Sequence, residues 1–191
     1  MDSIRAFIAF KLPDRIPGFI REIQKKLKQR GIKLKWVLPE NVHLTLKFLG
    51  DIPCDRIDSI ETAIKVSAEG MRPISLLAGS IGVFPNASRP RVVWIGIDGE
   101  IGILAGFQKK LDENLAHLGF QAETRTYKGH LTIGRVRKAP DPENLKTAIR
   151  DFFDYKTEPF HVDEVILFQS DLKPEGAVYT CLKNIRFSDD R

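Results

Sequence analysis

The sequence of 191 residues predicts an α+β fold of two similar lobes, one from each half of the chain. Two observations indicate this fold. Strand-like and helix-like patterns follow one another in the same order in both halves. The tetrapeptides HLTL (43–46) and HLTI (130–133) also stand about half a chain length apart. Because no stretch rich in Gly, Ser or Pro separates the halves, we expect residues 1–191 to form a single two-lobed domain whose lobes pack tightly.

In the first half, alternation of apolar and polar residues predicts strands, and apolar residues at helical intervals predict helices. Gly31 and Gly70 are suited to end helices, and Asp55 behind Pro53 is suited to start one. The predicted elements, in chain order, are a strand over 3–12, a helix over 17–31, the strand of the first tetrapeptide, a helix over 55–69 and a hairpin of strands over 73–85 and 91–99.

The second half repeats this order. Its predicted elements are a helix over 101–118, the strand of the second tetrapeptide, a helix over 142–154 and strands over 160–170 and 177–187. If each lobe contributes its tetrapeptide strand to a shared face, the two histidines come together there.

The composition is that of a soluble globular protein, with 42% hydrophobic and 29% charged residues. No apolar run approaches the ~20 residues that span a bilayer, and the N-terminal residues do not have the pattern of a signal peptide. Cys54 and Cys181 show neither a disulfide framework nor a CxxC spacing. We therefore expect a cytoplasmic protein.

The formal net charge of +5 favours polyanionic partners, with nucleic acid first among them. Residues 25–36, KKLKQRGIKLKW, hold six Lys or Arg and end in Trp36, an aromatic residue on which a base could stack. The competing interpretation is the solvated face and C-terminal end of an amphipathic helix. Both interpretations place this segment at the surface.

The two tetrapeptides share a chemical layout. Successive side chains of a strand point to opposite faces, so His43 and Thr45 share one face and the aliphatic residues between and after them share the other. The same holds for His130 and Thr132. We expect each strand to anchor its aliphatic face in a core and to present an imidazole beside a hydroxyl on the opposite face.

Two such units across a cleft suit displacement at a phosphodiester. The attacking oxygen loses a proton on one side of phosphorus, and the leaving oxygen gains one on the other. Imidazole titrates near pH 6.5, so one ring can act as base while the other acts as acid. Threonine hydroxyls can donate hydrogen bonds to the non-bridging oxygens, where charge gathers in the transition state.

Two other interpretations compete with catalysis. A lone histidine in a strand is more often structural, but structural packing gives no reason for the same His-Leu-Thr to recur in both halves. A metal site would need further His, Cys or carboxylate ligands, which HxT lacks nearby. We therefore expect no metal and no cofactor.

Several stretches carry a family resemblance: HLTL, HLTI, FIAFKLP near the start, RVVWIGID after the long loop, and the Arg that follows HLTI. They resemble the two-histidine (HxTx) phosphoesterases, and more narrowly the RNA 2′,3′-cyclic phosphodiesterase family, historically called 2′-5′ RNA ligase. The resemblance covers essentially the whole chain. It implies two pseudo-symmetric lobes of antiparallel sheet with helices packed outside and a central water-filled cleft that both motifs face.

The resemblance also implies an activity: hydrolysis of 2′,3′-cyclic phosphate ends of RNA to 2′-phosphates. In such enzymes the first motif histidine is taken as proton donor and the second as acceptor, which are His43 and His130 here. The implied partner is RNA with 2′,3′-cyclic phosphate 3′ ends, with tRNA halves as one source, and we expect a monomer without a membrane partner.

Two cationic residues near the motifs are candidate phosphate ligands. Lys47 continues the parity of His43 and Thr45, so a regular strand would direct it into the cleft. The alternative interpretation is a solvated lysine at the end of the strand. Arg135 has the wrong parity, but Gly134 before it could permit a bulge that redirects the guanidinium, and the family resemblance favours a role at the phosphate.

Aromatic residues offer a possible stacking wall for the terminal base, with Phe10, Phe48 and Trp94 as candidates. Aromatic residues in strands are mostly core residues, and we expect Phe48 to be one of them.

Two alternatives to hydrolysis remain open at this stage. The same two rings could join a 2′,3′-cyclic phosphate to a 5′-hydroxyl and form a 2′-5′ linkage. A non-catalytic protein could bind RNA ends through a basic cleft, although binding alone does not require a matched proton donor and acceptor.

Overall fold

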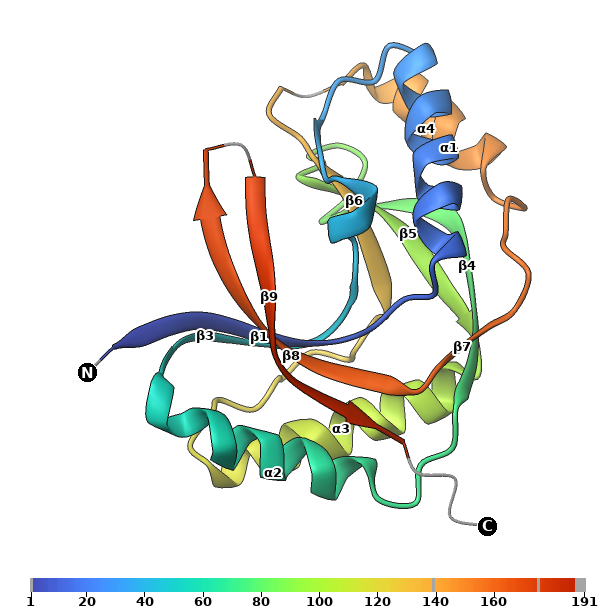
Figure 1. The fold of residues 1–191 in the computed structure, drawn as a ribbon. Coiled ribbons are helices and arrows are strands. Elements are labelled where there is room, and N and C mark those ends of the chain that lie inside the picture. Colours follow the sequence, from blue (N-terminus) through green and yellow to red (C-terminus); the bar gives the residue numbers. More distant parts are fainter. Residues whose placement is uncertain (1, 139, 175, 188–191) are drawn as a thin grey trace.

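The computed structural model describes residues 2–138, 140–174 and 176–187, and over these residues it shows a nine-stranded antiparallel sheet flanked by four α-helices (Figure 1). The strands are β1 (Ser3–Phe10), β2 (Lys35–Trp36), β3 (Leu44–Pro53), β4 (Ile74–Phe84), β5 (Val92–Gly99), β6 (His130–Arg135), β7 (Phe160–Val162), β8 (Glu164–Lys173) and β9 (Gly176–Arg186). The helices are α1 (Arg15–Gln29), α2 (Ile57–Ala68), α3 (Ile101–His117) and α4 (Pro142–Asp151), with short 3₁₀ helices η1 (Pro39–Asn41) and η2 (Cys54–Arg56).

The strand order is β7-β4-β5-β6-β3-β1-β8-β9, and β2 also pairs with β6. The two motif strands, β3 and β6, are therefore neighbours in the middle of the sheet. They pair through Leu44 and Leu131, where one lobe meets the other. Figure 1 shows α1 and α4 covering the lobe of β4, β5 and β6, and α2 and α3 covering the lobe of β1, β3, β8 and β9.

Each lobe is built from both halves of the chain, and the expectation of one lobe per half is wrong. After β1 the chain crosses to the other lobe to form α1, and after β5 it crosses back to form α3 (Figure 1). Because the halves are interleaved, no linker is needed between them. The predicted α+β fold class with two lobes is confirmed.

The predicted helices are present with small shifts at their ends. In α1 the buried side chains include Ile16, Ile20 and Ile23, which recur on one face, and Gly31 ends the segment with a positive φ of 75°. Helix α2 begins directly after Arg56, because η2 occupies the residues before it, so Asp55 does not cap the helix.

Helix α4 is shorter than expected. Its start is capped by Asp141, whose carboxylate accepts a hydrogen bond from the Asn144 backbone N–H at 2.7 Å. The helix ends at Asp151, before the predicted 154, and the next residue, Phe152, is buried in the core. The helix thus ends where Phe152 packs into the core.

The aliphatic face of both motif strands lies in the core, as the alternation predicts. The residues concerned are Leu44, Leu46, Leu131 and Ile133, each at most 3% exposed. Burying a side chain of this size contributes about 1.5–3 kcal/mol, so each strand is held firmly on the side away from its histidine. Among the described residues, no helix is long and apolar enough to cross a membrane.

Candidate active site

A cavity of about 490 Å³ lies between the two lobes, and both motifs contribute to its wall. Its lining includes the predicted residues His43, Thr45, His130, Thr132 and Arg135. Two further cationic residues, Arg5 and Lys35, also line it, whereas none of its lining residues is an Asp or Glu. The cavity is therefore suited to an anion.

The two histidines are held in the same way. The Nδ1 atom of His43 is 2.9 Å from the Asn41 carbonyl oxygen, and the Nδ1 atom of His130 is 2.8 Å from the Lys128 carbonyl oxygen. A carbonyl only accepts, so Nδ1 of each ring carries the hydrogen. Each Nε2 is then the nitrogen left to accept or donate a proton in the cavity.

The antiparallel pairing brings each histidine toward the threonine of the other motif. Strands β3 and β6 run in opposite directions through the Leu44–Leu131 pair. Residues on either side of that pair therefore approach crosswise, His43 toward Thr132 and Thr45 toward His130. An HxT motif on each of two antiparallel strands thus yields two imidazoles and two hydroxyls around one point.

The two rings differ in their surroundings. His43 stacks on Phe7 with ring centroids 4.4 Å apart and meets the edge of Tyr179 at 5.2 Å. This burial lowers the pKa of His43 to about 4, and the nearby His130 adds to the effect, against the hydrogen bond to Asn41. The His130 ring contacts Phe84 at 5.0 Å and is more open to solvent.

A β-bulge follows the threonine of each motif. In β3 the register against β1 slips at Leu46, and in β6 the register against β5 slips at Ile133. A bulge places two consecutive side chains on the same face, so the next side chain turns to the opposite one. The parity that a regular strand would have is thereby reversed at Lys47 and Phe48 in β3 and at Gly134 and Arg135 in β6.

The bulge in β6 directs Arg135 into the cavity, as Gly134 in the sequence predicts. A larger residue at position 134 would require the Leu34 side chain to move. A Cβ atom at position 134 would lie 2.8 Å from Cδ1 of Leu34, closer than side chains approach.

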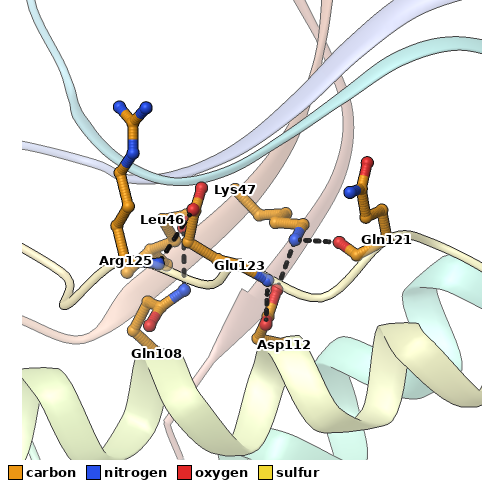
Figure 2. Close-up of polar contacts among 7 residues, drawn as sticks. All are labelled: Leu46, Lys47, Gln108, Asp112, Gln121, Glu123 and Arg125. Atoms are coloured by element: carbon orange, nitrogen blue, oxygen red, sulfur yellow. Dashed lines mark hydrogen bonds and ion pairs between the residues drawn. The ribbon is translucent and has the colours of Figure 1, made fainter.

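The bulge in β3 has the opposite consequence for Lys47, and the expectation that this residue faces the cleft is wrong. Lys47 does not line the cavity. Its ammonium points toward α3, where it donates to the Asp112 carboxylate and, at 2.6 Å, to the Gln121 carbonyl oxygen (Figure 2). Both side chains of the ion pair are only 11% exposed.

This buried ion pair belongs to a larger network behind β3 (Figure 2). Asp112 also accepts the Glu123 backbone N–H at 2.8 Å, which fastens the loop that leads to His130. The Tyr127 hydroxyl, on the same loop, donates to the Thr45 carbonyl at 2.8 Å. These contacts tie the strand of the first motif to the segment that precedes the second.

Phe48 is not a core residue as expected. It follows the bulge in β3, lines the cavity and is 65% exposed. Phe10 is fully buried in the core. Trp94 does not line the cavity but lies against the His130 ring, with centroids 6.2 Å apart.

Several lining residues were missed by the sequence analysis. Arg5 and Phe7 lie on the face of β1 opposite its buried Ala6 and Ile8, so the alternation of that strand held the signal. Tyr179 reaches the cavity because β9 pairs beyond β8, a neighbour relation that local patterns do not contain. Within the described ranges, His, Cys, Asp and Glu side chains form no group of three or more that could hold a metal ion.

The interleaved two-lobed sheet and the paired HxT motifs are those of a two-histidine phosphoesterase fold. The family model for LigT-like phosphoesterases matches the chain twice, over residues 10–94 and 95–179. The chain belongs to this family, and the resemblance noted in its sequence is confirmed.

Curated relatives match over nearly the whole chain. The RNA 2′,3′-cyclic phosphodiesterase of Methanothermobacter thermautotrophicus is 34% identical over 96% of this chain and 99% of its own length. The enzyme of the same name from Methanocaldococcus jannaschii is 36% identical, over 94% of this chain and 99% of its own.

Solved structures support the fold. A crystal structure from Thermus thermophilus superposes with a TM-score of 0.78 at 23% identity, over 98% of this chain and 100% of the other. Escherichia coli LigT in complex with NADP⁺ gives a TM-score of 0.69 at 24% identity, over 99% of this chain and 100% of the other.

Removing the negative end of the buried ion pair should destabilise the protein strongly. In Asp112→Asn the Lys47 ammonium stays buried without a carboxylate, and we expect a loss of about 3–5 kcal/mol in the free energy of unfolding. Urea denaturation measures it. Glu113→Gln, which breaks the exposed pair with Lys109, serves as control and should cost below about 1 kcal/mol. Equal losses in the two variants would contradict a special role for the buried pair.

The low pKa of His43 predicts a response to anions. The ring should be neutral in the free protein at pH 7 and should gain a proton only as the pH falls toward about 4. Inorganic phosphate in the cavity should raise this pKa, because a nearby negative charge favours the imidazolium. NMR titration of the ring protons, with the exposed His117 and His161 as references for unspecific phosphate effects, measures the shift. A pKa near 6.5 that phosphate leaves unchanged would contradict the burial argument.

Proposed function

We propose that the protein hydrolyses 2′,3′-cyclic phosphodiester ends of RNA to 2′-phosphomonoesters by metal-independent acid–base catalysis. The observation that carries this proposal is the matched pair of Nδ1-anchored histidines, His43 and His130, on one cavity lined by cations and free of carboxylates. The names of the curated relatives, RNA 2′,3′-cyclic phosphodiesterases, supply the substrate class.

In the proposed reaction, water attacks phosphorus from the side of His130. Nε2 of His130 takes a proton from the water as the new P–O bond forms. The P–O3′ bond breaks on the opposite side, and Nε2 of His43 gives its proton to O3′. The product carries the phosphate on O2′ and a free 3′-hydroxyl. The direction of proton transfer and the choice of leaving oxygen follow the family resemblance.

The proposed donor role requires a proton on His43 at neutral pH. In the free protein burial lowers its pKa to about 4, so the neutral ring predominates. A phosphodiester carries a negative charge, which favours the imidazolium and opposes the desolvation that lowers the pKa. We therefore propose that His43 takes up its proton when substrate binds.

The remaining polar side chains fit the charge that develops on the phosphate. The hydroxyls of Thr45 and Thr132 are proposed to donate to the two non-bridging oxygens, one from each lobe. Arg135, which the bulge turns into the cavity, is proposed to bind the same oxygens through its planar guanidinium. Phe48 and Phe7 give the cavity an aromatic side that suits the terminal nucleoside.

A single assay tests the proposed reaction. Pure protein is incubated, in excess chelator, with an RNA oligomer that ends in 2′,3′-cyclic phosphate, and the position of the product phosphate is determined. We expect a 2′-phosphate, in the same yield as without chelator. Formation of a 2′-5′ linkage with a 5′-hydroxyl oligomer would identify a ligase instead. Restoration of a chelated, inactive protein by a divalent ion would move the proposal to metal catalysis.

Single substitutions test the histidines. His43→Ala and His130→Ala should each lower kcat by at least ~10²-fold to 10⁴-fold, the usual contribution of general acid or base catalysis. Thr45→Val and Thr132→Val should lower it by roughly 10-fold to 10³-fold, as when one oxyanion donor is removed. His117→Ala, an exposed histidine outside the cavity, is the matched control. Near-full activity of either motif histidine variant would overturn the mechanism.

A further inference from the structure

We propose that the RNA strand preceding the reacting end leaves the cavity over β2 and lies along the basic C-terminal end of α1. This inference rests on the proposed function for its substrate and adds a second binding surface outside the catalytic cavity. We define this surface, the RNA track, by Lys25, Lys28, Lys33, Lys35 and Trp36.

The size of the cavity requires such a surface. A volume of about 490 Å³ is in the range that holds one small ligand. The terminal cyclic nucleotide would fill it, and the rest of an oligomer must cross the rim and lie on the protein surface or in solvent.

The rim has a cationic exit at β2. Lys35 of β2 pairs with Arg135 of β6 across the ladder, so a lysine lies beside the arginine that faces the cavity. Trp36, the next residue, also lines the cavity. An RNA backbone that leaves the cavity at this point passes directly from Arg135 to Lys35.

Two other parts of the rim suit a polyanion less well than the β2 exit. Toward the β8–β9 hairpin the lining residues are uncharged, among them Ser170, Leu172 and Ala177. Toward β1 the cation is Arg5, but its partner across the ladder is Asp51. Beyond that rim a phosphate chain would meet a carboxylate.

The positive charge of the β2 exit continues onto α1. Lys25, Lys28 and Lys33 are exposed, and none of them forms an ion pair with any residue of the described ranges. By contrast, the neighbouring Lys26 and Arg30 are engaged with Glu22 and Asp151. In this segment, some cations form ion pairs within the protein, whereas Lys25, Lys28 and Lys33 remain available to bind a partner.

A contact joins the helix to the exit. The Lys28 ammonium lies 5.2 Å from the centre of the Trp36 ring, so α1 and β2 present one continuous surface. Cations that follow the backbone beside an aromatic ring on which a base can stack are the usual means of binding single-stranded nucleic acid. This combination favours single-stranded RNA over an acidic protein, which would not use the ring in this way.

The test compares a long and a short substrate. The variant Lys25→Gln/Lys28→Gln/Lys33→Gln leaves every cavity residue intact. For an RNA oligomer of about ten nucleotides with a 2′,3′-cyclic end, we expect KM to rise roughly tenfold at low salt with kcat held, since about three phosphate contacts are lost. For a 2′,3′-cyclic mononucleotide, kcat and KM should not change.

Salt dependence supplies a second measurement. The slope of log affinity against log salt should become shallower by about 2 in the triple variant, because each single-strand phosphate contact contributes ~0.7. Lys65→Gln/Lys109→Gln/Lys110→Gln, with three exposed lysines removed from α2 and α3 on the other lobe, is the charge-matched control. It should leave the oligomer KM near that of the parent protein.

Two outcomes would contradict the proposed RNA track. An unchanged oligomer KM in the first triple variant would show that the RNA leaves elsewhere. An equal rise of the oligomer KM in both triple variants would show that the effect depends only on net charge. Failure of the proposed function is a separate result, because the parent protein would then hydrolyse neither substrate. In that case, the fluorescence anisotropy of a labelled oligomer would still compare its affinity for the parent protein and the two triple variants.

Discussion

The site depends on how two antiparallel strands meet at one residue pair. Strands β3 and β6 touch through Leu44 and Leu131, and the cavity lies where they diverge. That pair fixes which histidine approaches which threonine, since the motifs on either side of it must lie crosswise. Because so short a ladder cannot by itself hold two catalytic groups in register, other contacts must. The hydrogen bond of Tyr127 to Thr45 joins the two motif segments from behind, where the buried Lys47–Asp112 pair also holds the loop.

The two motif strands share the same local structure, but the side chains that surround their histidines differ. Both histidines donate Nδ1–H to a carbonyl two residues earlier, and both motifs are followed by a bulge. The residue that the bulge turns inward is Phe48 in one strand and Arg135 in the other. The side chain that follows the first bulge is thereby aromatic and the one that follows the second is cationic, and His43 is the ring that stacks on Phe7 and meets Tyr179. A symmetric fold thus places two like rings in unlike surroundings, and the proposed reaction gives one the role of proton donor and the other that of proton acceptor.

Much of this site follows from the sequence, and the failures have a common cause. The period of two in each motif correctly separates the His and Thr face from the aliphatic face, and Gly134 correctly signals the bulge before Arg135. No glycine marks the bulge at Leu46 in β3, so parity misplaces both Lys47 and Phe48. The interleaving of the halves and the arrival of Tyr179 depend on strand pairings between distant segments, which local patterns do not specify.

The central claim is that each imidazole carries one of the two proton transfers in a turnover, one ring as acceptor and the other as donor, and the pH dependence of kcat tests it most directly. For a 2′,3′-cyclic mononucleotide, kcat should follow a bell-shaped curve, with one limb from the ring that must be neutral and one from the ring that must be charged. His130→Ala should remove the limb at low pH and His43→Ala the limb at high pH. A bell that neither substitution alters, or a rate that does not change with pH, would contradict the account.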